Sequence, residues 1–227
     1  MLLDPSIKPS CTLQPLLQRG VPLASQRALH IIVHGRQGGE IPNLLLRLAE
    51  SVSRQRSAAV VLESLTQDAP SLDIGGDLWV VPLFLLPGSH TRVDVPGISQ
   101  RLERPGRTVR RLPFLGAWPV WLDMLEDWIR RQMQLEQPTT ALLHHPLRPG
   151  VADRYLRMLQ HRLPLPLLPF DQWQCKRWPP RSSRRLLPLA LAPNKMSDAI
   201  EQASRAPVLL ECPQICRGLV QLLASLP

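Results

Sequence analysis

Residues 29–39 read Leu-His-Ile-Ile-Val-His-Gly-Arg-Gln-Gly-Gly, a branched apolar run that ends on His34 and opens into a glycine-rich turn. The next apolar residues have the spacing of one helix face: Leu45, Leu48, Ala49 and Val52. A buried strand, a loop and an amphipathic helix in this order form one α/β unit. In open α/β sheets, ligands bind beyond the carboxyl ends of the strands, so His34 lies where chemistry is expected.

Two further strands are predicted to end near chemically useful side chains. Residues 78–90 repeat the first pattern, because their apolar run breaks at a turn that leads to His90. Between these two stretches, residues 58–63 read Ala-Ala-Val-Val-Leu-Glu and predict a strand that ends at Glu63. The carboxyl ends of parallel strands meet at one edge of a sheet, so we expect His34, Glu63 and His90 to lie close together.

These three residues are candidate metal ligands and catalytic residues. Two neutral imidazoles and one carboxylate form a ligand set that suits divalent iron, cobalt, nickel or zinc. Taken singly, each residue is more often an ordinary polar loop or surface residue. Three such residues after three successive strands favour the metal site.

The rest of the chain predicts more elements of the same kind. In the first half we expect a helix that begins at Asp94, a strand over 108–112 and a helix over 118–133. In the second half we expect a strand that ends at His144 and His145, a helix over 151–159, an irregular proline-rich segment over 164–180, an apolar run over 186–193, a helix over 198–203 and a last helix after Pro213.

The two halves read as a degenerate repeat. Residues 81–87 resemble residues 187–193, residues 31–35 resemble residues 142–146, and Met196 stands where the first copy has His90. We therefore predict an α/β protein of two similar lobes, each a small, mostly parallel sheet flanked by helices, that face a shared cleft. The expected division is a proline-containing extension over 1–27, a lobe with the metal-site histidines over 28–136 and a diverged lobe over 137–227.

Charge and composition limit the choice of partner and compartment. The net charge of +9 suits an anionic ligand, but one tyrosine and three phenylalanines give little aromatic surface for stacking nucleic-acid bases. The sequence has no membrane-spanning run and no zinc-like cysteine pairing, and we expect no secretory leader. We therefore expect a reduced cytoplasmic protein that binds neither nucleic acid nor membrane, as a monomer or a homodimer.

Positive side chains stand beside the candidate ligands. Arg36 and Arg92, together with Ser89, are candidate substrate-binding residues, because guanidinium groups bind carboxylates well. Plain surface exposure is an equally good interpretation of the two arginines. The glycine-rich turn before a helix is also compatible with an anion site, although it lacks both the dinucleotide spacing and the lysine of a nucleotide loop.

The chain resembles the sirohydrochlorin chelatases of the CbiX and SirB type over about residues 29–102. That family typically reads His-Gly-Ser after the first strand and Pro-Leu-Phe-Leu, Gly-x-His and Asp-Ile-Pro after the third. The matching segments here are His34-Gly35-Arg36, Pro82-Leu83-Phe84-Leu85, Gly88-Ser89-His90 and Asp94-Val95-Pro96. Arg36 replaces the family's serine.

The resemblance implies a class II chelatase fold and the insertion of cobalt or ferrous iron into sirohydrochlorin, a step of cobalamin or siroheme biosynthesis. It implies that His34, His90 and Glu63 bind the metal, which is a substrate, with nickel as a further option and no organic cofactor. Histidine chemistry agrees, because a group with a pKa near ~6.5 can both ligate a metal and accept a proton. The alternative is a non-catalytic carrier of metal or tetrapyrrole, and a nucleic-acid-binding protein is a weaker third.

Overall fold

The computed structural model describes residues 27–36, 38–65, 76–135, 138–175, 185–200 and 205–227. The predicted extension lies outside these ranges except for Arg27, and so does the predicted lobe boundary at 136–137. The boundaries of the three segments therefore stay a prediction.

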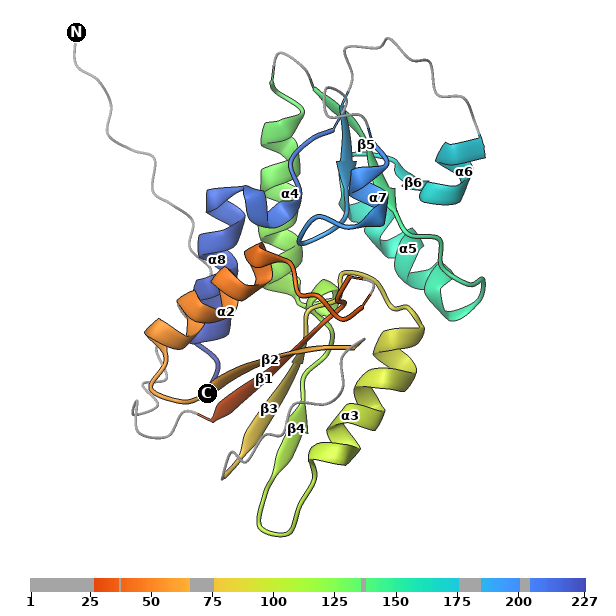
Figure 1. Cartoon of the computed structure of the whole chain (residues 1–227). Coiled ribbons are helices and arrows are strands. Elements are labelled where there is room, and N and C mark those ends of the chain that lie inside the picture. The colour runs from red at the N-terminus through yellow and green to blue at the C-terminus, as the bar shows by residue number, and fades with distance from the viewer. Residues whose placement is uncertain (1–26, 37, 66–75, 136–137, 176–184, 201–204) are drawn as a thin grey trace, which may run out of the picture.

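Two parallel sheets form the frame of the molecule (Figure 1). The first has the order β2-β1-β3-β4, and the second has the order β6-β5-β7. The strands are β1 (Ala28–Val33), β2 (Val60–Ser64), β3 (Leu78–Pro82), β4 (Val109–Arg111), β5 (Thr139–His144), β6 (Leu167–Pro169) and β7 (Arg185–Pro188). The predicted pair of similar lobes is confirmed, because the first strand of each sheet lies between the second and the third: β1 between β2 and β3, and β5 between β6 and β7.

The strand registers repeat as well. Ile32 of β1 lies opposite Pro82 of β3, and Leu143 of β5 lies opposite Pro188 of β7. Each central strand therefore delivers the residue two positions later to the same place in its lobe. These residues are His34 and His145.

Helices surround both sheets. They are α2 (Asn43–Gln55), α3 (Val95–Leu102), α4 (Pro119–Gln132), α5 (Val151–Arg162), α6 (Phe170–Cys175), α7 (Lys195–Asp198) and α8 (Pro213–Ala224). Helix α8 packs between α2 and α4, and Arg162 of α5 forms ion pairs with Asp123 and Glu126 of α4. The last helix of the chain thus packs against the first helix of the N-terminal lobe (Figure 1).

One central core joins the two lobes. Alternate residues of β1 (Leu29, Ile31, Val33) pack with the buried face of α4 and with Leu142 of β5. The other face of β1 belongs to a smaller cluster, in which Ile32 packs beneath Val95 and Leu102 of α3. Strand alternation therefore sends the two sets of β1 side chains into two different cores.

The segment over 164–180 is not irregular throughout, so that prediction was wrong for its described part. It holds β6, which is an edge strand that ends on Pro169, and then α6. Prolines are compatible with an edge strand because its outer side needs no backbone donors. The expected helix over 198–203 instead begins at Lys195 and its α-helical part ends at Asp198, with residues 201–204 outside the described ranges.

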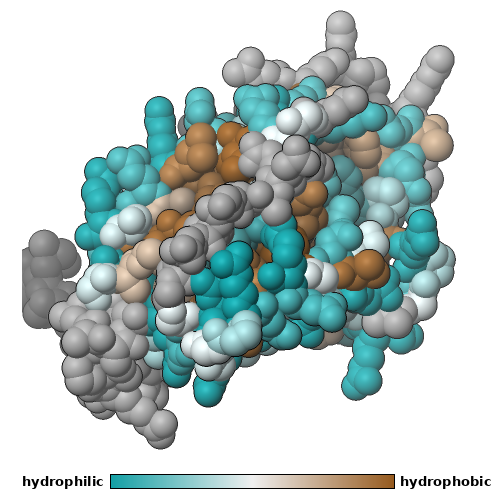
Figure 2. Space-filling view, turned by 60° about the horizontal axis from the view of Figure 1, so that its bottom comes forward, coloured by the Kyte–Doolittle hydropathy of each residue, from teal (hydrophilic) through white to brown (hydrophobic). Residues whose placement is uncertain are grey.

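The described surface has its large exposed apolar side chains on separate elements. Leu46 lies on α2, Val93 precedes α3, Met158 lies on α5, and Met133 and Leu135 follow α4. In Figure 2, hydrophobic residues emerge between hydrophilic ones on the face in view. None of the helices in the described ranges has the length and apolar content needed to cross a bilayer.

Candidate functional site

A cavity of about 1160 Å³ lies between the lobes. Its walls are the loops that follow β1, β3, β5 and β7, which are residues 33–36, 83–90, 145–148 and 189–195, together with part of α2 and α7. Both sheets therefore direct the carboxyl ends of their strands at one space, as expected for ligand sites of parallel sheets. The predicted cleft is present.

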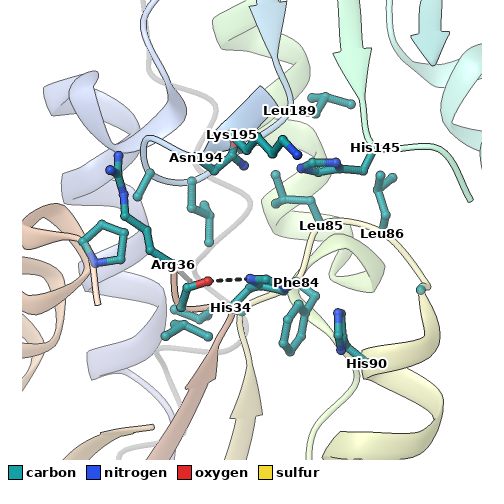
Figure 3. A pocket seen from close by; sticks show the side chains of 18 of the residues that line it. His34, Arg36, Phe84, Leu85, Leu86, His90, His145, Leu189, Asn194 and Lys195 are labelled. Atoms are coloured by element: carbon teal, nitrogen blue, oxygen red, sulfur yellow. Dashed lines mark hydrogen bonds between the residues drawn. The ribbon is translucent and has the colours of Figure 1, made fainter. Parts of the chain in front are cut away.

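His34 and His90 lie next to each other in the wall of this cavity (Figure 3). Their ring centroids are 4.9 Å apart, with the planes at 74°. His34 Nδ1 lies 2.7 Å from the carbonyl oxygen of Gly35, and His90 Nδ1 lies 2.6 Å from Asp94 Oδ2. A carbonyl and a carboxylate can only accept, so both Nδ1 atoms donate, and in the neutral form of each ring Nε2 keeps a lone pair for a metal.

Asp94 is a candidate functional residue that the sequence analysis missed. We expected Asp94 to lie at the start of a helix, but it makes no cap hydrogen bond. Residues His90–Asp94 instead form a single π-helical turn before α3, which brings the His90 ring to the Asp94 carboxylate. A carboxylate on Nδ1 orients the ring and makes Nε2 a better ligand. The four-residue spacing of His90 and Asp94 was the available signal.

Glu63 lies apart from this pair. It stands opposite Ile32, on the sheet face that α3 covers, and its side chain is 3% exposed. Its carboxylate lies 2.5 Å from His30 Nε2 and 2.6 Å from Arg101 Nη2. Within the described ranges, no group of three or more His, Cys, Asp or Glu side chains is placed to hold a metal. The structure therefore brings His34 and His90 together without Glu63.

The Glu63 cluster predicts a pH-dependent contribution to stability. Burial raises the pKa of Glu63, but hydrogen bonds and charge attraction from His30 and Arg101 outweigh it, so the pKa is lowered overall. A lowered carboxyl pKa gives stability that is present above the unfolded value of about 4.3 and lost as pH falls through the folded value. We expect Glu63→Gln to lose about 1–3 kcal/mol at pH 7 by urea denaturation.

The difference between wild type and Glu63→Gln should narrow as pH falls below the unfolded carboxyl value of about 4.3, and it should vanish once pH has passed through the lower folded value. Glu103→Gln is a suitable control, because this exposed residue follows the end of α3. A Glu63→Gln protein as stable as wild type at pH 7 would show that the buried cluster contributes nothing to folding.

The three candidate substrate-binding residues, Ser89, Arg36 and Arg92, all line the cavity. Arg36 Nη2 reaches across to the second lobe, 3.4 Å from both the Pro193 carbonyl oxygen and Asp198 Oδ2. Arg92 Nε lies 3.5 Å from the Gly88 carbonyl oxygen. Both guanidinium groups are exposed, so a ligand in the cavity can reach them.

His145, rather than the neighbouring His144, is the histidine that the end of β5 places at the cavity. His145 lines the cavity, whereas His144 is buried and donates from Nδ1 to the His145 carbonyl oxygen. Lys195 and Arg148 line the cavity too, and the sequence analysis had named neither of them. The internal repeat could have indicated Lys195, because this residue stands at the position that Ser89 occupies in the first copy.

Tyr155 of α5 connects the second lobe to the loop that carries His90. Its hydroxyl lies 2.9 Å from the Leu85 carbonyl oxygen and 2.8 Å from that of Gly116, and it donates to this pair of acceptors. Burial raises the pKa of Tyr155, so the hydroxyl keeps its hydrogen at neutral pH. These hydrogen bonds hold α5 against two loops of the first lobe.

Two lobes that direct parallel strands at one cavity, with paired imidazoles at the edge of one sheet, form a chelatase-like fold. The family model CbiX matches residues 28–132. This match covers most of the predicted first lobe, and the resemblance to the CbiX and SirB chelatases is confirmed.

Solved structures show the same fold. Sirohydrochlorin chelatase SirB from Bacillus subtilis subspecies spizizenii, solved in complex with cobalt, has a TM-score of 0.60 at 15% identity, over 88% of this chain and 95% of SirB. A multi-domain protein from Deinococcus radiodurans, similar to chelatases but with two additional novel domains, has a TM-score of 0.53 at 21% identity. That match covers 88% of this chain and only 54% of the other, so this chain spans about half its length. No curated protein matches the sequence.

Proposed function

We propose that this protein is a metallochelatase that inserts a divalent metal, Co²⁺ or Fe²⁺, into sirohydrochlorin. The observation that carries the proposal is the His34–His90 pair, with both Nε2 lone pairs available at the wall of a large cavity. The cavity volume of about 1160 Å³ exceeds the ~300–1,000 Å³ of ordinary small-molecule pockets, so a macrocycle has room. The match of the CbiX family model to residues 28–132 supports the same activity.

Two ligands suit a metal that must be passed on. A structural site closes four protein ligands around its ion, whereas a reactive site leaves positions open. An ion on His34 and His90 keeps open positions that the pyrrole nitrogens of the substrate can occupy. The metal is thus a substrate in transit, and the borderline ligand set accepts cobalt, iron or nickel.

The cavity also suits the other substrate. Its floor is apolar where residues 83–86 and 189–192 line it, and cationic side chains stand around it. Sirohydrochlorin carries carboxylates on the edge of a flat ring, so an apolar floor with a basic rim matches its chemistry. We assign Arg36, Arg92 and Ser89 to the substrate carboxylates.

The test is anaerobic insertion of Co²⁺ and of Fe²⁺ into sirohydrochlorin, followed by absorbance. We expect the wild type to turn over and His90→Ala to lose at least about 100-fold in kcat/KM. Loss of an outer-shell partner of a metal ligand typically costs 10–100-fold, and loss of the ligand itself should cost no less.

A matched control is His161→Ala, which removes an exposed histidine from the last turn of α5, outside the cavity. This variant should keep wild-type turnover. Tight binding of sirohydrochlorin with no turnover for any metal would contradict the enzyme and leave the carrier, the alternative drawn from the sequence.

A further inference from the structure

His145 faces the metal-binding pair from the opposite wall of the cavity. Figure 3 places it on the second-lobe side, above His34 and His90. The register explains its position, because His145 follows the Leu143–Pro188 pair just as His34 follows the Ile32–Pro82 pair. A flat ligand that enters between the lobes therefore has an imidazole on each side.

The second lobe lacks the partner that would make His145 half of a metal site. Met196 occupies the position of His90, and it is fully buried in the core of the second lobe. The first lobe therefore presents the two imidazoles of His34 and His90 to the cavity, and the second lobe presents that of His145. The rings of His145 and Phe170 lie edge to face, at 70° with their centroids 6.3 Å apart.

Metal insertion needs a proton acceptor, and the imidazole of His145 can act as one. The macrocycle loses two pyrrole protons when it takes up M²⁺, and His34 and His90 have their Nε2 lone pairs committed to the ion. A proton acceptor is therefore needed elsewhere, and the face of the macrocycle away from the metal is open to one. Partial burial lowers the pKa of His145, and the nearby His34 and His144 lower it further, so its ring is neutral at pH 7.

We propose that His145 accepts the pyrrole protons during metal insertion, on the face of the macrocycle opposite the His34–His90 pair. This inference rests on the proposed chelatase function. In each step a pyrrole N–H bond breaks, its proton goes to the unprotonated ring nitrogen of His145, and the electron pair left on the pyrrole nitrogen forms the bond to M²⁺. The imidazolium returns its proton to water, and a second cycle gives the metallated ring and two released protons in total.

The test compares His145→Ala with wild type in two assays, Co²⁺ insertion into sirohydrochlorin and equilibrium Co²⁺ binding without tetrapyrrole. General base catalysis typically contributes 10²–10⁴-fold, so we expect kcat to fall about 100-fold. The KM for metal and the affinity for Co²⁺ should stay at their wild-type values. Added imidazole should restore part of the lost kcat in this variant and should leave wild type unchanged.

Two further variants separate the possible outcomes. His145→Gln keeps the size of the side chain but has no basic nitrogen, so it should lose as much kcat as His145→Ala. His161→Ala should behave as wild type. Wild-type kcat in His145→Ala, or a loss of Co²⁺ affinity in that variant, would overturn the role of His145 alone. A wild-type protein that inserts no metal would overturn the chelatase function and this inference with it.

Discussion

Gly116→Ala is expected to destabilise the protein by about 3–5 kcal/mol. Gly116 lies in a buried 3₁₀ turn, Leu115–Ala117, between β4 and α4. A Cβ at this position would stand 2.0 Å from the Leu85 carbonyl oxygen and 2.7 Å from the Tyr155 hydroxyl. Backbone on one side and a hydrogen-bonded ring on the other leave it no room.

Two costs add up in this variant. Forcing a methyl group into a well-packed site typically costs about 1–3 kcal/mol, and displacing the Tyr155 hydroxyl removes hydrogen bonds worth about 1 kcal/mol each. For a chain of this size, each kcal/mol lowers the melting temperature by about 2–4 °C. Thermal unfolding followed by circular dichroism should therefore show a drop of roughly 6–20 °C.

Gly97→Ala is the matched control. Gly97 lies in α3, and a Cβ there would meet nothing within 4 Å. Alanine is favoured over glycine in a helix by up to about 1 kcal/mol, so this variant should be neutral or slightly more stable than wild type. Equal melting temperatures for Gly97→Ala and Gly116→Ala would contradict the close packing described for the His90 loop.

Arg56→Ala should cost about 3 kcal/mol, for a reason that lies far from the cavity. Arg56 follows the end of α2 and is 7% exposed. Its Nη1 donates to three carbonyl oxygens at the end of α8, those of Leu223 at 3.2 Å, Ala224 at 3.2 Å and Leu226 at 2.6 Å. Its Nη2 donates to the Arg27 carbonyl oxygen at 2.5 Å, in the residue that precedes β1.

The Arg56 guanidinium thus donates hydrogen bonds to backbone carbonyls near both ends of the described chain. Alanine would leave these carbonyls without their donor in a largely buried site, at about 1–3 kcal/mol for each group that water does not reach. The positive charge of Arg56 also interacts favourably with the negative, C-terminal end of the α8 dipole. Arg56→Lys should recover only part of the loss, because an ammonium lacks the planar fork that spans the two sets of acceptors.

The measurement is the midpoint of urea unfolding, with Arg54→Ala as the matched control. Arg54 is the exposed basic residue of the same helix turn, with its Nη2 3.7 Å from Glu50 Oε1, and exposed pairs of this kind contribute about 0.3–0.5 kcal/mol. An Arg56→Ala protein that unfolds at the same urea concentration as Arg54→Ala would show that the last helix does not depend on this residue.

The strand ends could be predicted from sequence because they depend on local patterns. An apolar run that breaks at a turn places His34 at the edge of a sheet. Similar apolar runs that end in turns lead to His90 and His145. The repeat gave the two lobes. These features need no knowledge of which side chains meet across long distances.

Glu63 and Asp94 could not be placed correctly in the same way. Whether Glu63 faces the cavity or α3 depends on the register of β2 against β1, where it pairs with Ile32, one residue before the strand ends. Its partner Arg101 lies 38 positions later in the chain, so nothing near Glu63 indicates the ion pair. Asp94 was interpreted as the start of a helix because Asp-Val-Pro is common at that position. Its carboxylate faces His90 because residues His90–Asp94 form a π-helical turn.

The position of α8 also bears on the order in which the molecule is assembled. This helix lies against α2, and α2 is held at its end by the Arg56 contacts to the last turn of α8. On a ribosome, the N-terminal sheet is therefore synthesised well before the helix that completes its cover, so the first lobe leaves the ribosome with the α8 face of α2 still exposed to water.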